Sequence, residues 1–338
     1  MSCQGMQLTR FSEPDELLTA LPGVTLRAVP LRDGGFDASL VSFTLGDIAL
    51  QVGECSPAII LAATNDTMSV VQLPFEGLET FLLNGRPAPS CPVGLYGPGG
   101  GLERVSSQRT RHAALFMPVV AAEALLSASA ASPLLRPGAQ ALLQARPLLW
   151  KRVIDLIRAA TTTGIANPPI FDAEEACRSL RASLLHGMHE LIAEPKQCGG
   201  SQIVRESPAR RRIVRAADEY LQANPARPIY TDDLCGALGI STARLADAFR
   251  VTFGVSPHRF LKLRRLAMVR AALRSRDNDG PPLFVRTVAL MHGFWHFGQF
   301  ARDYRALYGE TPSATLARGH GPSRQRDSRR AGSTVSKR

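Results

Sequence analysis

The chain has 338 residues, of which 45% are hydrophobic and 20% charged, a composition ordinary for a soluble globular protein. No run of about 18 apolar residues is present, so no membrane span is expected, and the first ten residues lack the pattern of a secretory signal. The six cysteines are scattered without a Cys-x-x-Cys pair. They predict neither a disulfide framework nor a zinc site and fit a reducing, cytoplasmic environment.

The positive charge of the chain lies mainly in its second part. The net charge is +11, and residues 201–338 contain 25 of the 40 basic and 11 of the 29 acidic residues, so this part carries +14 and residues 1–200 carry −3. Without the last twenty residues, the segment 201–318 still carries +9. A basic folded domain is expected where a protein faces a polyanion.

Residues from about 24 to 116 have the pattern of β-strands. Apolar and polar residues alternate over 41–45 and again over 48–52, on either side of the turn sequence Gly46-Asp47, which predicts a hairpin of half-buried strands. Segments 57–63 and 68–74 extend the series. From about 118 the sequence becomes rich in alanine and leucine. Helices are predicted within the periodic segments 119–129, 138–160 and 173–193. Residues 195–201 have the composition of an interdomain linker.

The rest of the chain is expected to be helical. A first helix over about 203–224 ends at Asn224-Pro225, and Thr231 is placed to cap the next helix. Residues 231–253 and 283–308 then repeat one pattern, in which a short helix, a turn at a glycine (Gly239 or Gly293) and an amphipathic helix follow one another. This is the pattern of a helix-turn-helix, whose second helix lies in the DNA major groove.

A long helix is predicted between the two units. It begins with Ser256 as its cap and Pro257 as its first residue. About 18 residues at 1.5 Å each span roughly 27 Å. This length is enough to set two recognition helices about one DNA turn apart on the same face of a duplex.

The segment from about 210 to 318 resembles the DNA-binding domain of the AraC/XylS family of bacterial transcription regulators. The most specific likeness is the pair of endings Phe-Gly-Val-Ser-Pro at 253–257 and Tyr-Gly-Glu-Thr-Pro at 308–312. The stretch 293–304 looks similar to the subgroup that includes the ethanolamine-operon regulator. The resemblance implies a β-rich effector-binding or dimerisation domain in front, in agreement with the strand pattern of residues 24–116.

We therefore predict an α+β protein of three parts. Residues 1–200 form a β-rich, cupin- or jelly-roll-like domain with a helical segment from about 118. Residues 201–318 form an all-α DNA-binding domain with two helix-turn-helix units, and residues 319–338 form a basic disordered tail. The insertion at 276–282 is expected only to lengthen a loop.

The candidate DNA-binding residues are the polar side chains predicted to face outward on the two recognition helices: Thr242, Arg244, Asp247, Arg250, His296, Gln299, Arg302 and Arg305. Arg302 is suited to guanine and Gln299 to adenine, whereas Arg244 and Arg250 are suited to phosphates. Asp247 can accept from cytosine but would repel phosphate. The first helix also carries Ala243 and Ala246, so the second helix is expected to be the main reader of bases.

Other interpretations stay open for several of these residues. Arg302 could instead form an ion pair with Asp303 or Glu310, Gln299 could lie on a plain solvated face, and His296 could only cap its helix. Arg264 and Arg265 are expected to pack and pair within the domain. Phe294 and Trp295 are expected in the core rather than in a stacking site.

Catalytic and metal-binding patterns are missing from the sequence. His186 and His189 have a metal-compatible spacing but no further ligands, and His112 is the only histidine in residues 1–120, so the histidine cluster of enzymatic cupins is absent. The glycine-rich stretch at 97–101 has no nucleotide-binding spacing, and Cys91 has no evident histidine partner. We expect no cofactor and no enzymatic activity.

The sequence thus predicts a cytoplasmic, nucleoid-associated transcription regulator. Its expected partners are double-stranded promoter DNA, a small-molecule effector, a second copy of the chain and, if it activates, RNA polymerase; no membrane is expected. The alternatives are an architectural DNA-binding protein without an effector and an enzyme tethered to DNA by its C-terminal domain.

Overall fold

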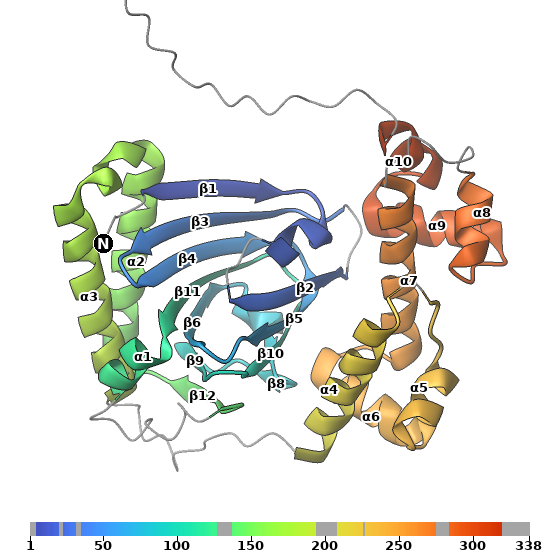
Figure 1. The fold of residues 1–338 in the computed structure, drawn as a ribbon, viewed down its shortest axis with the longest axis horizontal. Coiled ribbons are helices and arrows are strands. Elements are labelled where there is room, and N and C mark those ends of the chain that lie inside the picture. Colours follow the sequence, from blue (N-terminus) through green and yellow to red (C-terminus); the bar gives the residue numbers. More distant parts are fainter. Residues whose placement is uncertain are drawn as a thin grey trace, which may run out of the picture.

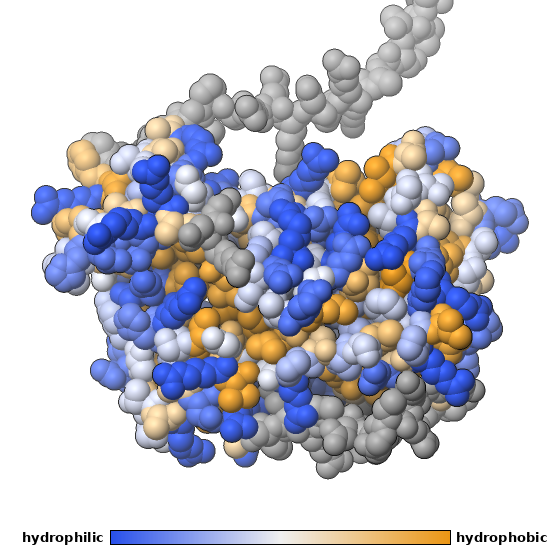
Figure 2. All heavy atoms as spheres, turned by 180° about the vertical axis from the view of Figure 1, so that it is seen from behind, coloured by the Kyte–Doolittle hydropathy of each residue, from blue (hydrophilic) through white to orange (hydrophobic). Residues whose placement is uncertain are grey.

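The computed structural model describes residues 5–19, 23–31, 35–126, 137–193, 208–225, 227–274 and 284–319. It contains a β-rich N-terminal part with three helices at one side and a helical C-terminal part at the other (Figure 1). Seen from behind, hydrophilic side chains cover much of the surface, and apolar ones gather in patches near the middle (Figure 2). None of the helices in the described residues is long and apolar enough to cross a membrane.

Two antiparallel sheets form the N-terminal part. The larger has the strand order β1-β3-β4-β11-β6-β9-β12 and the smaller β2-β5-β10-β7-β8. The strands are β1 (Met6–Phe11), β2 (Val24–Pro30), β3 (Ala38–Leu45), β4 (Ile48–Cys55), β5 (Ala58–Thr64), β6 (Met68–Glu76), β7 (Leu82–Leu83), β8 (Arg86–Pro87), β9 (Pro92–Tyr96), β10 (Gly101–Ser106), β11 (Thr110–Pro118) and β12 (Gln140–Gln144). The predicted hairpin is confirmed, because β3 pairs with β4 from Ala38↔Cys55 to Leu45↔Ile48.

The larger sheet has two buried faces, since successive side chains of a strand point to opposite sides. On β11, Leu115 belongs to a core with the helices α1 (Val119–Leu126), α2 (Pro147–Ala166) and α3 (Glu174–Ala193). Ala114 and Phe116 face the other way, toward the smaller sheet. The three helices therefore cover the outer face, and a cavity lies between the sheets.

The described residues of the C-terminal part form seven helices. They are α4 (Pro208–Ala223), α5 (Thr231–Leu238), α6 (Thr242–Phe253), α7 (Pro257–Arg274), α8 (Val285–Met291), α9 (Phe297–Tyr308) and α10 (Pro312–Gly319). The long helix α7 joins the two predicted units, with α5 and α6 packed near its start and α8, α9 and α10 beside its later turns (Figure 1). α7 has the predicted 18 residues and begins at Pro257.

The two motif endings have a common physical cause. Gly254 (φ 67°) and Gly309 (φ 71°) end α6 and α9 in the left-handed conformation that favours glycine. Ser256 Oγ then accepts from the backbone N–H of Arg259 at 3.3 Å, and Thr311 Oγ1 accepts from Ala314 at 3.2 Å. Each ending therefore stops one helix and caps the next.

Several sequence predictions need correction. The segment 138–160 is not one helix, because residues 140–144 form β12, which pairs with β9, and α2 begins only at Pro147. A strand, β1, precedes the predicted β region. Thr231 is the first residue of α5 rather than its cap. The cap residue is Tyr230, whose N–H donates to Asp233 Oδ2 at 2.8 Å.

The parts of the chain outside the described residues include three predicted segments. They are the linker at 195–201, the insertion at 276–282 and the basic tail from 320 onward.

Candidate DNA-binding surface and ligand cavity

Helix α6 presents a polar outer face. Leu245, Ala248 and Phe249 are buried at i, i+3 and i+4, as predicted, and hold the helix on the domain core. The four candidate residues on this helix are all exposed: Thr242, Arg244, Asp247 and Arg250. Their side chains are therefore available to a partner in solution.

Asp247 has a partner that the sequence did not suggest. Arg210 of α4 donates from its Nε to Asp247 Oδ2 at 2.7 Å. This pair neutralises the one acidic side chain on the outer face of α6. It also brings Arg210 beside the outer face of α6.

Helix α9 carries a connected row of polar side chains. Arg302 Nη2 donates to Gln299 Oε1 at 2.9 Å, and Gln299 Nε2 donates to Asp303 Oδ1 at 3.0 Å. Lys262 of α7 lies 3.2 Å from the second oxygen of Asp303. Arg302 therefore contacts a neutral amide rather than Asp303 or Glu310, and its positive charge is not matched by a carboxylate among the described residues.

The buried side of α9 agrees with the sequence. Phe300, Tyr304, Leu307 and Tyr308 are all buried, and the candidate residues Gln299, Arg302 and Arg305 are exposed on the opposite side. Glu310, the other suggested partner of Arg302, instead pairs with Arg270 and Arg318.

The start of α9 differs from the prediction at one residue. His296 occupies the cap position without a side-chain capping hydrogen bond and is exposed. Phe294 is buried, as expected, but the prediction that Trp295 lies in the core is wrong, because 72% of its surface is exposed. The turn before α9 directs only the ring of Phe294 into the core, so Trp295 lies on the surface beside His296.

Two arginines of α7 pack and pair within the domain, as predicted. Arg264 Nη2 donates to the carbonyl oxygens of Leu221 at 2.8 Å and Asn224 at 3.0 Å, at the end of α4. Arg265 is buried, and its guanidinium lies over the rings of Tyr230 and Phe294 at 4.6 and 5.1 Å.

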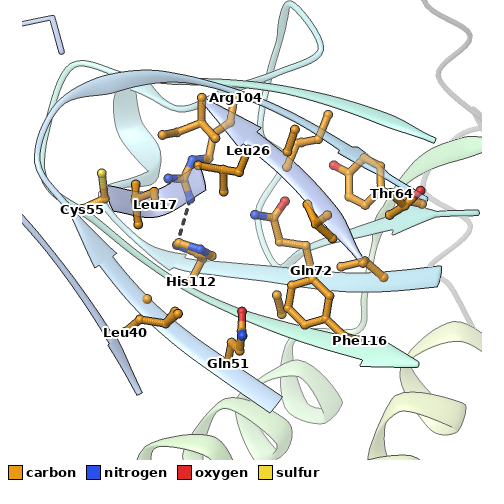
Figure 3. A pocket seen from close by; sticks show the side chains of 18 of the residues that line it. Leu17, Leu26, Leu40, Gln51, Cys55, Thr64, Gln72, Arg104, His112 and Phe116 are labelled. Carbon is orange, nitrogen blue, oxygen red and sulfur yellow. Dashed lines mark hydrogen bonds between the residues drawn. The ribbon is translucent and has the colours of Figure 1, made fainter. Parts of the chain in front are cut away.

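The cavity between the sheets is the second candidate site. The hollow takes in about 820 Å³ of space, part of which is open solvent. Its walls are mostly apolar, with contributions from Leu26, Leu40, Ile60 and Phe116. A few buried polar side chains project among them, and such a combination is typical of small-molecule sites (Figure 3).

Arg104 and His112 form the most polar part of this cavity. Arg104 on β10 is only 4% exposed, and its Nη1 lies 2.8 Å from His112 Nδ1 on β11 (Figure 3). A guanidinium can only donate, so Nδ1 accepts and a neutral His112 carries its proton on Nε2. Burial, and secondly the Arg104 charge, lower the pKa of His112 well below 6.5. The sequence did not reveal this pair, because both faces of β10 and β11 are largely buried and the order of residues does not show which face lines a cavity.

Acid is expected to destabilise the fold partly through His112. The unfolded chain takes up a proton near pH 6.5, whereas the buried ring stays neutral. The unfolded state therefore binds more protons, and stability falls as the pH drops through that value. The loss is about 1.4 kcal/mol for each pH unit between the unfolded and folded pKa values.

Thermal melts between pH 7 and 5 test this expectation. His112→Gln should flatten the pH dependence. His292 is the matched control, because burial also lowers its pKa. His292→Gln should remove only the part of the pH dependence that His292 itself contributes. An unchanged slope in His112→Gln would contradict the assignment.

Among the described residues, no group of three or more His, Cys, Asp or Glu side chains could hold a metal ion. His189 Nδ1 lies 3.1 Å from the carbonyl oxygen of Leu125, and His186 Nε2 lies 3.7 Å from Glu190.

The C-terminal part packs on the outer face of the smaller sheet. Val29, Ile59 and Val105 belong to the same apolar core as residues of α6 and α7. Arg27 of β2 pairs with Asp218 of α4. This contact leaves the outward faces of α6 and α9 exposed.

An ion cluster joins the two parts at a second place. Arg270 of α7 donates from Nε and Nη2 to the two oxygens of Glu13, both at 2.6 Å, and from Nη1 to Glu310 at 2.7 Å. Arg274 lies 2.5 Å from Glu13. The side chains of Arg270 and Glu13 are only 12% and 10% exposed, so this pair is largely shielded from solvent.

Known proteins resemble the chain over about a third of its length. A helix-turn-helix domain model matches residues 234–318. The XylDLEGF operon transcriptional activator 2 of Pseudomonas putida is 32% identical over 117 residues, which is 34% of this chain and 69% of that protein. The probable thc operon regulatory protein of Rhodococcus erythropolis is 31% identical over 118 residues, or 34% of each chain. The crystal structure of a probable AraC family transcriptional regulator from Rhodopseudomonas palustris CGA009 is 40% identical over 32% of this chain and 99% of that one, with a TM-score of 0.29.

The matches cover only about a third of the length of two curated relatives. They cover 34% of the probable thc operon regulatory protein and 36% of the XylDLEGF operon transcriptional activator of Pseudomonas putida. One relative is nevertheless covered over more than two thirds of its length at above 30% identity. The chain also carries paired helix-turn-helix units. The last helix of each unit ends at a glycine in the left-handed conformation, and a capped helix that begins at a proline follows it. On these grounds the chain belongs to the AraC/XylS family of transcription regulators.

Proposed function

We propose that the protein recognises a promoter with α6 and α9 in successive major grooves and responds to a small molecule bound in its N-terminal cavity. The observation that carries this proposal is the exposure of all eight candidate side chains on two helices joined by α7. The N-terminal cavity supports an effector rather than a purely architectural role. We assign the DNA-binding function to residues 201–318 and effector binding or dimerisation to residues 1–200.

The two recognition helices have unequal roles in this proposal. On α9, Gln299 and Arg302 offer the donor and acceptor groups that read adenine and guanine. On α6, Ala243 and Ala246 offer none and Asp247 is engaged by Arg210. We therefore assign base reading chiefly to α9, and phosphate contact to Arg244, Arg250, Arg305 and Arg210.

Partners follow from the same reasoning. The Pseudomonas putida relatives are operon transcriptional activators, so we propose activation, with RNA polymerase as a partner. Homodimerisation through residues 1–200 and action on chromosomal DNA in the nucleoid complete the proposal. The stretch 293–304 supports placement in the subgroup similar to the ethanolamine-operon regulator.

Binding to the DNA upstream of the protein's own gene tests the function. The exposed Trp295 supplies the signal, because a tryptophan at the start of a recognition helix should change its fluorescence when DNA covers it. Trp150→Phe leaves Trp295 as the only tryptophan. We expect specific binding at least about 1,000-fold tighter than to random DNA, falling steeply with salt as phosphates release counterions.

Two results would oppose the proposal. Equal affinity for promoter and random DNA would favour an architectural protein. Affinity independent of salt would exclude phosphate contacts by the arginines of α6 and α9.

A further inference from the structure

We propose that the cavity binds a small apolar molecule with one carboxylate, and that Arg104 holds that carboxylate. The inference rests on the proposed function in assigning the cavity to an effector, and it adds the chemical class of the ligand. Its basis is a buried positive charge that has no negative partner among the residues that the structure describes.

Arg104 lies almost entirely out of solvent, with 4% of its surface exposed. Its only hydrogen bond within the described part of the chain goes to the neutral His112. A guanidinium keeps its charge in proteins, and burying a charge is costly unless it is paired. The structure therefore maintains a cation at this position without an anion to balance it.

The nearby acidic residues do not supply the missing anion. Glu54 lines the cavity, but its oxygens accept from Arg109 Nη1 at 2.9 Å and Arg111 Nε at 3.0 Å. Glu103 is the chain neighbour of Arg104 and so points to the other side of β10, where it lines a separate hollow with Arg211 and Asp218. The thiol of Cys55 also lines the cavity, and burial raises its pKa, which keeps it neutral.

Two buried amides extend the polar part of the cavity. Gln51 and Gln72 are 7% and 4% exposed and point into the cavity with Arg104 and His112 (Figure 3). Among the described residues, Oε1 of Gln72 is buried without a hydrogen-bond partner. Together with the free donors of Arg104, these amides form a built binding site rather than a single charge in an apolar wall.

The shape and chemistry of this set favour a monocarboxylate. The planar guanidinium presents parallel N–H donors that match the two oxygens of a carboxylate. The remaining wall is apolar, so the rest of the ligand is expected to be hydrocarbon. A neutral alcohol would leave the cation unbalanced, and a sugar would bury more hydroxyl groups than the few polar side chains can satisfy.

The ligand would act close to the DNA-binding part. Arg104 faces the cavity from β10, whereas the next residue, Val105, belongs to the core shared with α6 and α7. A ligand that pulls on Arg104 therefore acts on the strand against which the C-terminal part packs. Regulation then requires only that the carboxylate bind one arrangement of the two parts better than another.

Calorimetry and thermal shift with matched probes test the inference. The full chain is titrated with straight-chain monocarboxylates of about six to twelve carbons and with primary alcohols of the same lengths, which differ chiefly in charge. We expect a carboxylate to bind and raise Tm and the matching alcohol to bind at least about tenfold more weakly. Arg104→Met should lose this preference, and Arg104→Lys should keep part of it.

A second readout separates ligand binding from a merely structural role of Arg104. Without ligand, Arg104→Met should melt no lower than the wild type, because it removes an unbalanced buried charge. A structural role, such as the contact of its guanidinium with the Phe81 ring at 6.0 Å, predicts a lower Tm instead. Arg178→Met, on the exposed face of α3, is the matched control and should bind the carboxylate like the wild type.

The outcomes are distinguishable. Equal binding of alcohol and carboxylate overturns the carboxylate assignment and leaves the cavity as an effector site. Binding of neither probe series overturns the inference, and the promoter test of the proposed function is unaffected. The probe comparison on the wild type needs no variant to fold.

Discussion

Replacing Arg302 by alanine is expected to weaken promoter binding by about 1–3 kcal/mol, or roughly 5- to 150-fold. The side chain is exposed near the middle of α9 and contacts only Gln299 among the described residues. Its guanidinium is thus available for a bidentate contact with guanine. The loss should be confined to promoters with the preferred base at one position, because other bases already lack that contact.

Competition binding with promoter variants measures this effect. Arg305→Ala is the matched control on the same exposed side of α9, and it should weaken binding about equally on all sequences, as expected for a phosphate contact. An Arg302→Ala loss that is uniform across sequences would reassign Arg302 to phosphate. No loss would remove α9 from the reading surface.

Replacing Glu13 by glutamine is expected to destabilise the protein by about 2–3 kcal/mol. Breaking a fully buried pair typically costs about 3–5 kcal/mol, and Arg270 retains Glu310 in this variant. The cost is large because Arg270 and Arg274 both lose the charge of Glu13, and the side chains of Arg270 and Glu13 are largely buried. Since Glu13 belongs to the N-terminal part, the variant weakens the contact between the two parts.

Scanning calorimetry follows this loss and resolves whether the two parts then unfold separately. Glu219→Gln is the matched control, because Glu219 and its partner Arg215 are 64% and 63% exposed. An exposed pair contributes about 0–1 kcal/mol, so that variant should melt close to the wild type. Equal Tm values for the two variants would show that the cluster does not hold the parts together.

The proposed difference between α6 and α9 rests partly on local sequence and partly on tertiary structure. The alanines of α6 and the polar residues of α9 suggested the asymmetry directly. The ion pair between Arg210 and Asp247 strengthens it, and it joins residues 37 positions apart. No local pattern reports such a contact.

Two failed predictions have different physical causes. Residues 140–144 were expected in a helix, yet they form an edge strand because β9 offers unpaired backbone groups beside them. Trp295 was expected in the core, yet the turn before α9 directs only Phe294 inward. A strand remote in sequence decided the first outcome, and the geometry of the turn decided the second.

The DNA-binding helices and the β3–β4 hairpin could be read from the sequence because their signals are local. Glycine, capping residues and apolar periodicity act within a few residues of where they stand, so helix ends and buried faces follow from them. The cavity is different in kind. Arg104 and His112 meet across two sheets, and their burial and missing anion arise only when β10 and β11 enclose a common space. Charge balance in that space depends on which side of each strand faces inward, which the order of residues alone does not state.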